Sequence, residues 1–232
     1  MLILLPPSES KAVPTRGRPA DLATLPFAAP LGPLRERLVA AVDPALLATP
    51  TARADKLYTG VLYSELDFAT LSPAGRRRAA RQVLIASGLW GLVSPASRLP
   101  AYKLPIGERV RGVGGLAAAW RPLVGEALIP TDRPRNLVVD CRSGGYASVW
   151  RPARADHVHV RPLQVQPDGS RKPISHMAKA GRGRVARALL EAGDVERPED
   201  ALAAVAAAGM EAELTPEERG GPSRWTLDVL ER

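Results

Sequence analysis

Cysteine is nearly absent from this sequence, which has Cys141 alone among its 232 residues. One thiol forms no intrachain disulfide, and it excludes a metal site built from several cysteines. Histidine is also scarce. His157 and His159 form an H-x-H pair in an expected strand, where alternate side chains share a face, but no third ligand is obvious nearby. We therefore expect no metal and no cofactor, and an ordinary surface strand face at this pair.

Long apolar segments are missing as well. The apolar run at residues 2–5 is followed at once by Pro6 and Pro7, so it is too short for a signal peptide or a membrane span. We expect a cytoplasmic protein with no membrane partner. The Walker A, Rossmann, G-x-S-x-G and H-E-x-x-H motifs are absent too. Their absence removes the commonest ATPase, dehydrogenase, hydrolase and zinc-protease interpretations.

Positive charge, by contrast, is abundant. The net charge is +8 and the pI about 10.2, which favours an anionic partner such as nucleic acid or a phosphorylated metabolite; a basic surface without a partner is the alternative. Lysine and arginine together number 32. Lysine, whose pKa shifts readily on burial, occurs at only five positions, which makes each a candidate functional residue. These are Lys11, Lys56, Lys103, Lys172 and Lys179.

The pattern of apolar residues predicts an α/β or α+β fold, with a compact mixed sheet flanked by helices in a single domain over residues 1–232. Hydrophobic residues make up 45% of the chain and aromatic residues only 4%, so the core must consist mainly of Leu, Val and Ala. Pro162 favours an edge position for its strand. We expect strands at 2–5, 136–141, 157–165 and 223–230, and helices at 33–48, from 72 toward 85, at 114–128, 175–192 and 199–208.

The loop after the first expected strand carries the densest polar chemistry. It contains Ser8, Glu9, Ser10 and Lys11. Loops at the carboxyl ends of strands are common ligand sites in α/β folds. Lys11 is suited to bind an anion or, when desolvated, to act as a base, and Glu9 to act as a general acid or base. A hydrophilic surface turn is the alternative interpretation.

Two glycines dominate a second segment. Gly88 and Gly91 follow an expected helix, which resembles half of a helix–hairpin–helix whose backbone amides approach phosphate; a simple helix end explains Gly88 equally well. Trp90 between them is more typical of a core residue than of a base-stacking platform. Tyr102 and Lys103 follow in a proline-rich loop.

Two further segments contain candidate binding residues. Ser175 is a possible helix cap, and Lys179 and Arg182 lie three residues apart and so share one helix face suited to phosphate or carboxylate. Arg142 and Tyr146 follow another expected strand. Cys141 beside Arg142 is a candidate reactive thiol, although a buried inert thiol fits the apolar strand better.

Taken in order, these segments resemble the YaaA family of peroxide stress proteins. The motifs that carry the resemblance are Met1-Leu-Ile-Leu-Leu-Pro-Pro-Ser-Glu-Ser-Lys11, Tyr58-Thr59-Gly60, Ser87-Gly88-Leu89-Trp90-Gly91, Tyr102-Lys103-Leu104 with Gly107, Trp120, and Ser175, Ala178, Lys179, Arg182 and Gly183. The resemblance implies a role in limiting peroxide damage, linked to control of free iron. It also implies an unusual α/β fold with a basic cleft and a DNA-binding helix–hairpin–helix.

The residues leave several functions open. One is a nucleic-acid-binding stress protein in which Arg76 to Arg81, Lys103, Lys179 and Arg182 contact phosphates. Another is a hydrolase or lyase for a small anionic substrate such as a nucleotide or nucleobase derivative, with Glu9, Lys11 and Lys179 as hypothetical catalytic residues. A third is a non-catalytic iron-handling or partner-binding protein. The segment 140–146 and the residues His176 and Met177 depart from the family pattern, which leaves a role in specialised metabolism open.

Overall fold

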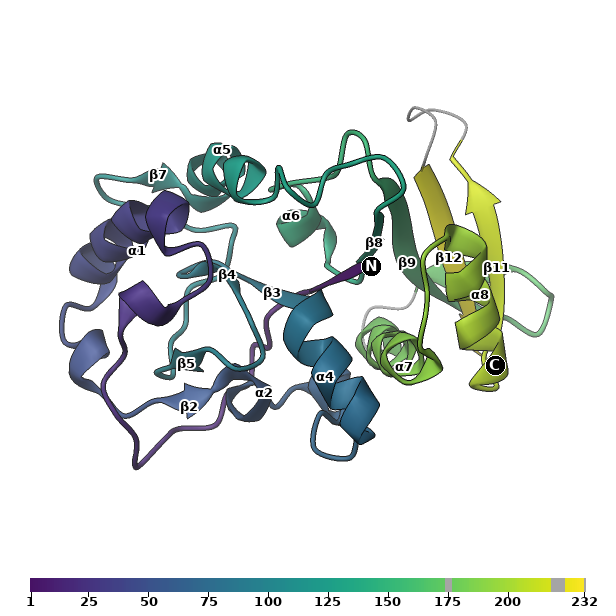
Figure 1. The fold of residues 1–232 in the computed structure, drawn as a ribbon, viewed down its shortest axis with the longest axis horizontal. Helices are drawn as coiled ribbons and strands as arrows, with labels where there is room; N and C mark the ends of the chain where they lie inside the picture. The colour runs from purple at the N-terminus through teal and green to yellow at the C-terminus, as the bar shows by residue number, and fades with distance from the viewer. Residues whose placement is uncertain (174–176, 218–223, 232) are drawn as a thin grey trace.

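An eight-stranded mixed sheet forms the centre of the protein (Figure 1). The computed structural model describes residues 1–173, 177–217 and 224–231. In spatial order the strands are β11 (Glu211–Pro216), β12 (Arg224–Glu231), β9 (Asp156–Val165), β8 (Leu137–Asp140), β1 (Leu2–Leu5), β3 (Val83–Ser87) and β4 (Gly91–Val93), and β10 (Arg171–Pro173) pairs with β9. With helices packed against this sheet, the predicted α/β fold is confirmed.

The order of the strands reverses at β1. From β1 the chain first adds β3 on one side, and later adds β8, β9 and β12 on the other, all parallel to their neighbours. The edge strands β4 and β11 run antiparallel to β3 and β12. The carboxyl ends of β1, β3 and β8 therefore lie next to one another at the point where ligands commonly bind in open α/β sheets.

Some helices pack against the sheet, and others pack on one another beside it. In Figure 1, α7 (Met177–Ala192) and α8 (Pro198–Ala207) lie in front of the part of the sheet formed by β9, β12 and β11, and α7 also packs on α3 (Val61–Leu66) and α4 (Pro73–Gln82). Opposite them, α1 (Ala28–Val42) packs on α5 (Leu116–Ala127). In the part of the chain that the structure describes, no helix has the length and apolarity needed to cross a membrane.

Short elements complete the fold. They are the 3-10 helices η1 (Leu22–Thr24) and η2 (Leu46–Ala48), the helices α2 (Ala54–Leu57) and α6 (Gly144–Ala147), and two small sheets, β2 (Ala52–Arg53) with β5 (Arg98–Leu99) and β6 (Arg109–Val110) with β7 (Gly114–Gly115). As predicted, Leu, Val and Ala make up most of the core, around a fully buried β1.

The expected helix from residue 72 begins as predicted but ends early. The Ser72 hydroxyl accepts a hydrogen bond from the Gly75 amide, and Pro73 occupies the first turn of α4. The prediction that helix continues to Ile85 is wrong, because Val83–Ser87 forms β3 between β1 and β4. Packing in the sheet outweighs any local preference for helix in so short an apolar run.

The predicted helix–hairpin–helix element is not found at its expected place. Gly88 lies in the turn between the antiparallel strands β3 and β4, and Gly91 is the first residue of β4, so two strands flank this turn and not two helices. Gly91 has a φ of 69°, in the left-handed region that favours glycine. Its pattern in the sequence therefore reflects the geometry of a β-hairpin.

The edge position predicted from Pro162 is wrong. β9 is an inner strand, paired with β12 on one side and with β8 and then β10 on the other. Proline is tolerated here because β8 pairs only as far as His159 and β10 begins at Leu163. The missing amide of Pro162 falls in this gap, where no strand requires it.

Candidate functional site

The loop after β1 is fastened to the segment after α2. The Ser8 hydroxyl accepts a hydrogen bond of 2.8 Å from the Gly60 amide, and the Thr59 amide donates to the Ser10 carbonyl at 3.2 Å. A Cβ atom at Gly60 would lie 2.4 Å from the Ser8 hydroxyl oxygen, so a larger residue would displace this hydroxyl from its hydrogen bond. The predicted binding residues Ser8, Ser10, Thr59 and Gly60 thus lie together, and their contacts shape the loop that carries Lys11.

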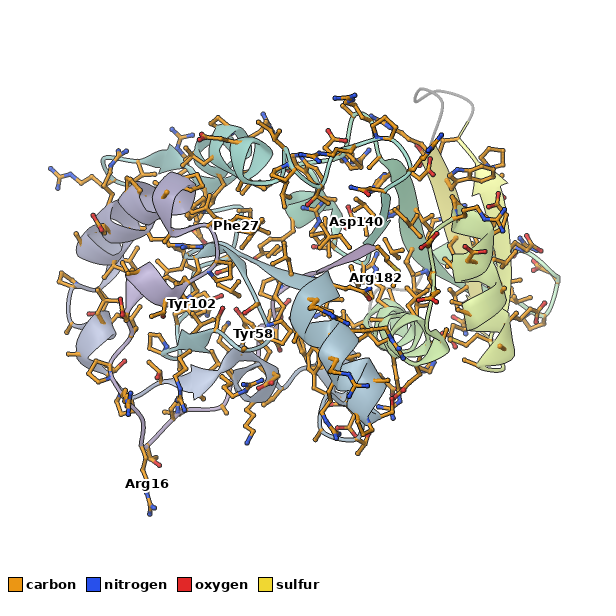
Figure 2. The ribbon with its side chains drawn as sticks, in the orientation of Figure 1. Arg16, Phe27, Tyr58, Tyr102, Asp140 and Arg182 are labelled. Atoms are coloured by element: carbon orange, nitrogen blue, oxygen red, sulfur yellow. The ribbon has the colours of Figure 1, made fainter. Side chains whose placement is uncertain are left out.

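The Lys11 amine lies against two tyrosine rings. Its Nζ is 4.5 Å from the ring centroid of Tyr102 and 5.6 Å from that of Tyr58, and it donates a 2.7 Å hydrogen bond to the Ser8 carbonyl. The hydroxyl groups of Tyr58 and Tyr102 lie 2.8 Å apart, and the Ser87 hydroxyl lies 2.6 Å from that of Tyr102. Tyr58, Tyr102 and Ser87, the last residue of β3, therefore form one chain of hydroxyl groups. Figure 2 labels Tyr58 and Tyr102.

The four tyrosines of the chain interact as one cluster, Tyr58, Tyr63, Tyr102 and Tyr146. Burial raises the pKa of every one of them, so all four hydroxyls stay neutral donors near neutral pH. The sequence analysis missed Tyr63, which donates to the Pro6 carbonyl at 2.7 Å. Because the chain has only four tyrosines, the rarity of this residue type is the signal in the sequence that could have identified Tyr63.

Burial also changes the protonation of Lys11. It lowers the pKa of the Lys11 amine to about 8, and the nearby Glu9 carboxylate only partly opposes this effect. A sizeable fraction of the Lys11 side chains is therefore a neutral amine near pH 8. A neutral amine is a base and a nucleophile, whereas an ammonium ion is neither.

Of the two basic residues predicted on α7, Lys179 contacts the same loop and Arg182 contacts β9. The Lys179 amine lies 3.3 Å from the Glu9 carboxylate, although both side chains are largely exposed. Arg182 is half-buried and donates to the Val160 carbonyl at 3.4 Å, beyond the end of β8. Lys11 and Lys179 thus both interact with Glu9. Ser175 lies outside the described residues.

A buried charged cluster follows the end of β8. Arg142 donates two hydrogen bonds of 2.8 Å to the Asp140 carboxylate and one of 2.6 Å to the Trp150 carbonyl, and the His157 ring lies 3.3 Å from the same carboxylate. Burial alone would raise the pKa of Asp140, but the bonds from Arg142 and His157 outweigh it and hold this pKa well below its usual range. The positive charge of Arg142, a predicted binding residue, is therefore neutralised by Asp140 inside the protein.

Two expectations about this region have different outcomes. The expected surface face at the histidine pair is wrong for His157, which is buried against Asp140. Cys141 is fully buried, as the inert-thiol interpretation predicts, and burial raises its pKa to about 12 despite the opposing charge of Arg182. Residues 1–173, 177–217 and 224–231 contain no group of three or more His, Cys, Asp or Glu side chains placed to hold a metal ion.

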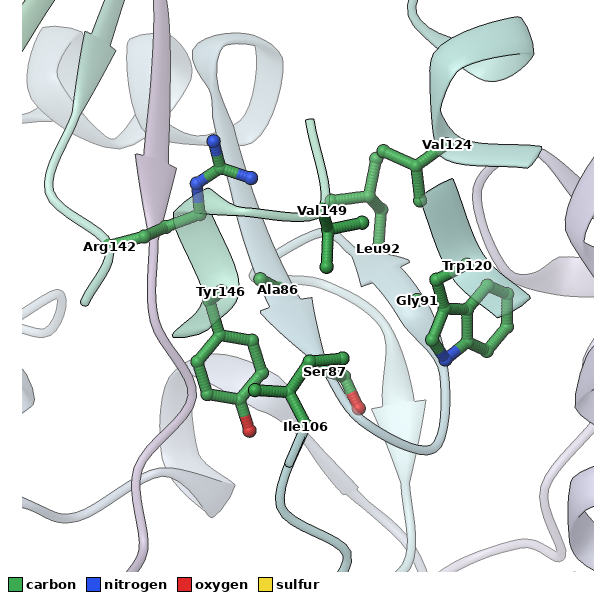
Figure 3. A pocket seen from close by; sticks show the side chains of 10 residues that line it. All are labelled: Ala86, Ser87, Gly91, Leu92, Ile106, Trp120, Val124, Arg142, Tyr146 and Val149. Atoms are coloured by element: carbon green, nitrogen blue, oxygen red, sulfur yellow. The ribbon is translucent and has the colours of Figure 1, made fainter. Parts of the chain in front are cut away.

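A small cavity lies beside the tyrosine cluster (Figure 3). Its volume is about 10 Å³, which is no more than one water molecule needs. Figure 3 shows the rings of Tyr146 and Trp120 on opposite sides of it, with Ser87 between them. It is an internal space and not a substrate pocket, so a ligand must approach Lys11 from the partly exposed side of that residue.

Two of the predicted binding residues do not present their side chains to a ligand at Lys11. Lys103 is exposed and lines a separate groove of about 370 Å³ together with Arg109 and Arg111, although its neighbour Tyr102 points into the cluster. Trp90 is fully buried in the core, and its ring packs edge-on against Tyr102 with the centroids 5.8 Å apart. It therefore positions Tyr102 and is not a stacking platform.

The fold and the site define a class of protein: an α/β protein with a polar site at the carboxyl ends of its central strands, where the strand order reverses. Comparison with known proteins gives the family. The family model described as peroxide stress protein YaaA matches residues 33–213. The chain belongs to the YaaA family.

Relatives from several bacteria share its sequence. A UPF0246 protein of Streptomyces coelicolor is 37% identical, covering 99% of this chain and 98% of its own length. One from Corynebacterium glutamicum is 34% identical over 93% and 96% of the two chains. One from Burkholderia mallei is 35% identical, over 66% of this chain and 60% of its own. The first two relatives match nearly from end to end.

Proposed function

We propose that this YaaA-family protein is an enzyme that binds a small anionic molecule at the carboxyl ends of β1, β3 and β8. The observation that carries the proposal is the position of the Lys11 amine, held against the rings of Tyr58 and Tyr102 where the strand order reverses. A lysine that only adds charge to the surface stays hydrated, whereas Lys11 is partly buried and its pKa is lowered. Titratable groups with shifted pKa values cluster at functional sites.

The surrounding groups divide into two kinds. Lys179 and Arg182 lie one turn apart on α7 and supply positive charge for an anion. Glu9 and Lys11 are suited to move protons, since Glu9 is solvent-accessible and Lys11 is partly deprotonated near pH 8. This combination fits a hydrolase or a lyase acting on a nucleotide, a nucleobase derivative or another small anion.

A ligand panel tests this proposal. The melting temperature of the wild-type protein would be measured with mono- and dicarboxylates, inorganic phosphate and nucleotides. We expect at least one anion to raise it. Arg182→Ala should weaken binding of that anion roughly tenfold. Arg154→Ala, which removes the same charge from an exposed loop, should leave binding unchanged. Equal loss in both variants, or no stabilising anion, would contradict the proposal.

A second candidate is protection from peroxide through binding of nucleic acid. It is supported by Arg77 and Arg81, which lie four residues apart on α4, are exposed, and form no ion pair with a carboxylate among the described residues. The two other arginines of this run already form hydrogen bonds within the protein. Arg76 donates to the Leu71 carbonyl and Arg78 to that of Leu190.

Gel shifts with duplex DNA across a salt series test the second candidate. If Arg77 and Arg81 contact phosphates, removing both with Arg77→Ala and Arg81→Ala should reduce the slope of log affinity against log salt by about 2. Lys172→Ala, at the remote strand β10, is the charge control. Binding that ignores salt, or equal effects of the two changes, would count against DNA binding.

A further inference from the structure

We propose that Lys11 is a nucleophile that forms an imine with the carbonyl carbon of a small keto or aldehyde acid. This inference rests on the proposed function and specifies its substrate class. The anionic end of such a molecule would face Lys179 and Arg182, and its carbonyl group would face the Lys11 amine from the partly exposed side of that residue, next to Tyr102.

The surroundings of Lys11 differ from those of a lysine that serves only as a cation. No ion pair joins Lys11 to a carboxylate in the described part of the chain, whereas Lys179 is paired with Glu9. The groups around Lys11 are aromatic rings, neutral phenols and the Ser8 carbonyl. The ring faces and the carbonyl attract the ammonium ion, but partial burial removes water from it and no carboxylate among the described residues pairs with it, so the neutral amine becomes accessible near pH 8. Desolvation of this kind is how imine-forming lysines are activated.

The hydroxyl chain beside the amine suits the second half of the reaction. Tyr102 bonds to both Tyr58 and Ser87, so a proton released at one end can be replaced from its neighbours. Lys11 remains partly exposed, so a small molecule can reach it without opening the core. These groups come from the ends of β1 and β3 and from the two loops that carry Tyr58 and Tyr102.

The reaction balances without an oxidant or a reductant. The lone pair of the Lys11 nitrogen attacks the carbonyl carbon, an N–C bond forms and the C=O π bond opens. A proton moves from nitrogen to the former carbonyl oxygen, which gives a carbinolamine. That hydroxyl then takes a proton from the Tyr102 chain and leaves as water, while loss of the remaining N–H proton restores the chain and gives the imine.

Reductive trapping tests the proposal. The intact protein would be incubated with pyruvate and sodium cyanoborohydride at pH 7.5, and the modified lysines would be mapped by mass spectrometry. The four other lysines are internal controls, because Lys56, Lys103, Lys172 and Lys179 are all more exposed than Lys11. We expect Lys11 to react at least tenfold faster than each of them, although access alone favours the others. Labelling of Lys11 no faster than that of the exposed lysines would overturn the proposal.

Two further arms separate this inference from the proposed function. Acetone is the uncharged counterpart of pyruvate, so preferential trapping of pyruvate that Arg182→Ala abolishes supports both. Trapping of Lys11 by both compounds equally, with no effect of Arg182→Ala, retains the nucleophile but contradicts the anion site. A stabilising anion in the ligand panel with no labelling of Lys11 retains the anion site and overturns the imine. Tyr102→Phe, which keeps the ring but removes the hydroxyl, should slow trapping several-fold.

Discussion

The hydroxyl groups of Tyr58 and Tyr102 lie 2.8 Å apart, although 44 positions separate the two residues in the chain. Tyr58 follows α2, and Tyr102 belongs to the loop that leaves β5. Their contact, extended by the 2.6 Å bond between Tyr102 and Ser87, connects both segments to the end of β3. The Lys11 site is therefore assembled from parts of the chain that only the complete fold brings together.

A first prediction concerns Tyr102 and Ser87, because among the described residues the Tyr102 hydroxyl bonds only to other hydroxyls whereas that of Ser87 also bonds to backbone amides. Tyr102→Phe removes one hydroxyl and should reduce the free energy of unfolding by about 1 kcal/mol. Ser87→Ala should cost about 2–3 kcal/mol, because the Ser87 oxygen also accepts from the buried amides of Leu89 and Trp90, which then lose their partner. Urea denaturation of both variants checks this order. A larger loss for Tyr102→Phe would show that the tyrosine chain, and not the β-hairpin turn, carries the stability.

Lys11 should make stability depend on pH. Its pKa is about 8 in the folded protein and 10.5 ordinarily, so between these values the unfolded chain binds more protons and stability rises with pH. Below pH 8 the folded protein bears the full cost of keeping the buried amine charged. Lys11→Met removes this cost, so the variant should gain most against wild type at pH 6–7 and progressively less toward pH 10.

The measurement is the difference in free energy of unfolding between variant and wild type at each pH, which cancels the titration of other groups. Lys56→Met serves as the control, because Lys56 is exposed and its difference should stay flat across the same range. A flat difference for Lys11→Met as well would mean that its amine titrates like an ordinary lysine in the folded protein.

Asp140 should dominate the acid side of the stability curve. Asp140→Asn leaves the buried Arg142 without its counter-charge, which should cost about 3–5 kcal/mol near neutral pH. Since the folded pKa of Asp140 lies below its ordinary 3.8, its contribution is present above that value and is lost as the pH falls further. Denaturation curves at pH 7 and pH 3 should thus show a smaller gap between wild type and variant at the lower pH. The exposed Asp168→Asn is the control, with a small effect at both.

The fold was largely predictable from patterns along the chain, and its errors have physical causes. The N-terminal cap of α4 and the apolar run at residues 2–5 are local signals, and both predict the observed element. The sequence predicts helix at Val83–Ser87 because a short apolar run after a helical pattern carries no period that separates helix from strand. Pro162 predicts an edge strand because the gap between β8 and β10 that accommodates it exists only once those strands have paired with β9.

The site was predictable by residue type more than by arrangement. Lysine stood out against the arginine-rich background, and Lys11 and Lys179 do meet at Glu9. Nothing local distinguishes Lys103, whose exposed side chain lines another groove while the adjacent Tyr102 points inward. The pairing of Arg142 with Asp140 removes a charge that the sequence presents as free. Tertiary contacts decide each of these cases.

Two helical glycines provide the last prediction, because they differ in what surrounds them. A Cβ atom at Gly183 in α7 would lie 2.3 Å from the Leu62 carbonyl oxygen of α3, so Gly183→Ala must push the two helices apart and should cost about 1–3 kcal/mol. Gly32 in α1 has no atom within 4 Å of the same position. Gly32→Ala should therefore stabilise the protein by about 0.5–1 kcal/mol through the better helix propensity of alanine.

Thermal unfolding of the two variants measures the contrast directly, since each adds one methyl group to the interior of a helix. The Gly183→Ala variant should also trap less pyruvate at Lys11, because α7 carries Lys179, which reaches Glu9 in the loop after β1. Gly32→Ala, on a helix that contributes nothing to that loop, should trap as much as wild type. Equal stabilisation by both substitutions would mean that α3 and α7 leave room for a methyl group at Gly183, which contradicts the close approach of these helices.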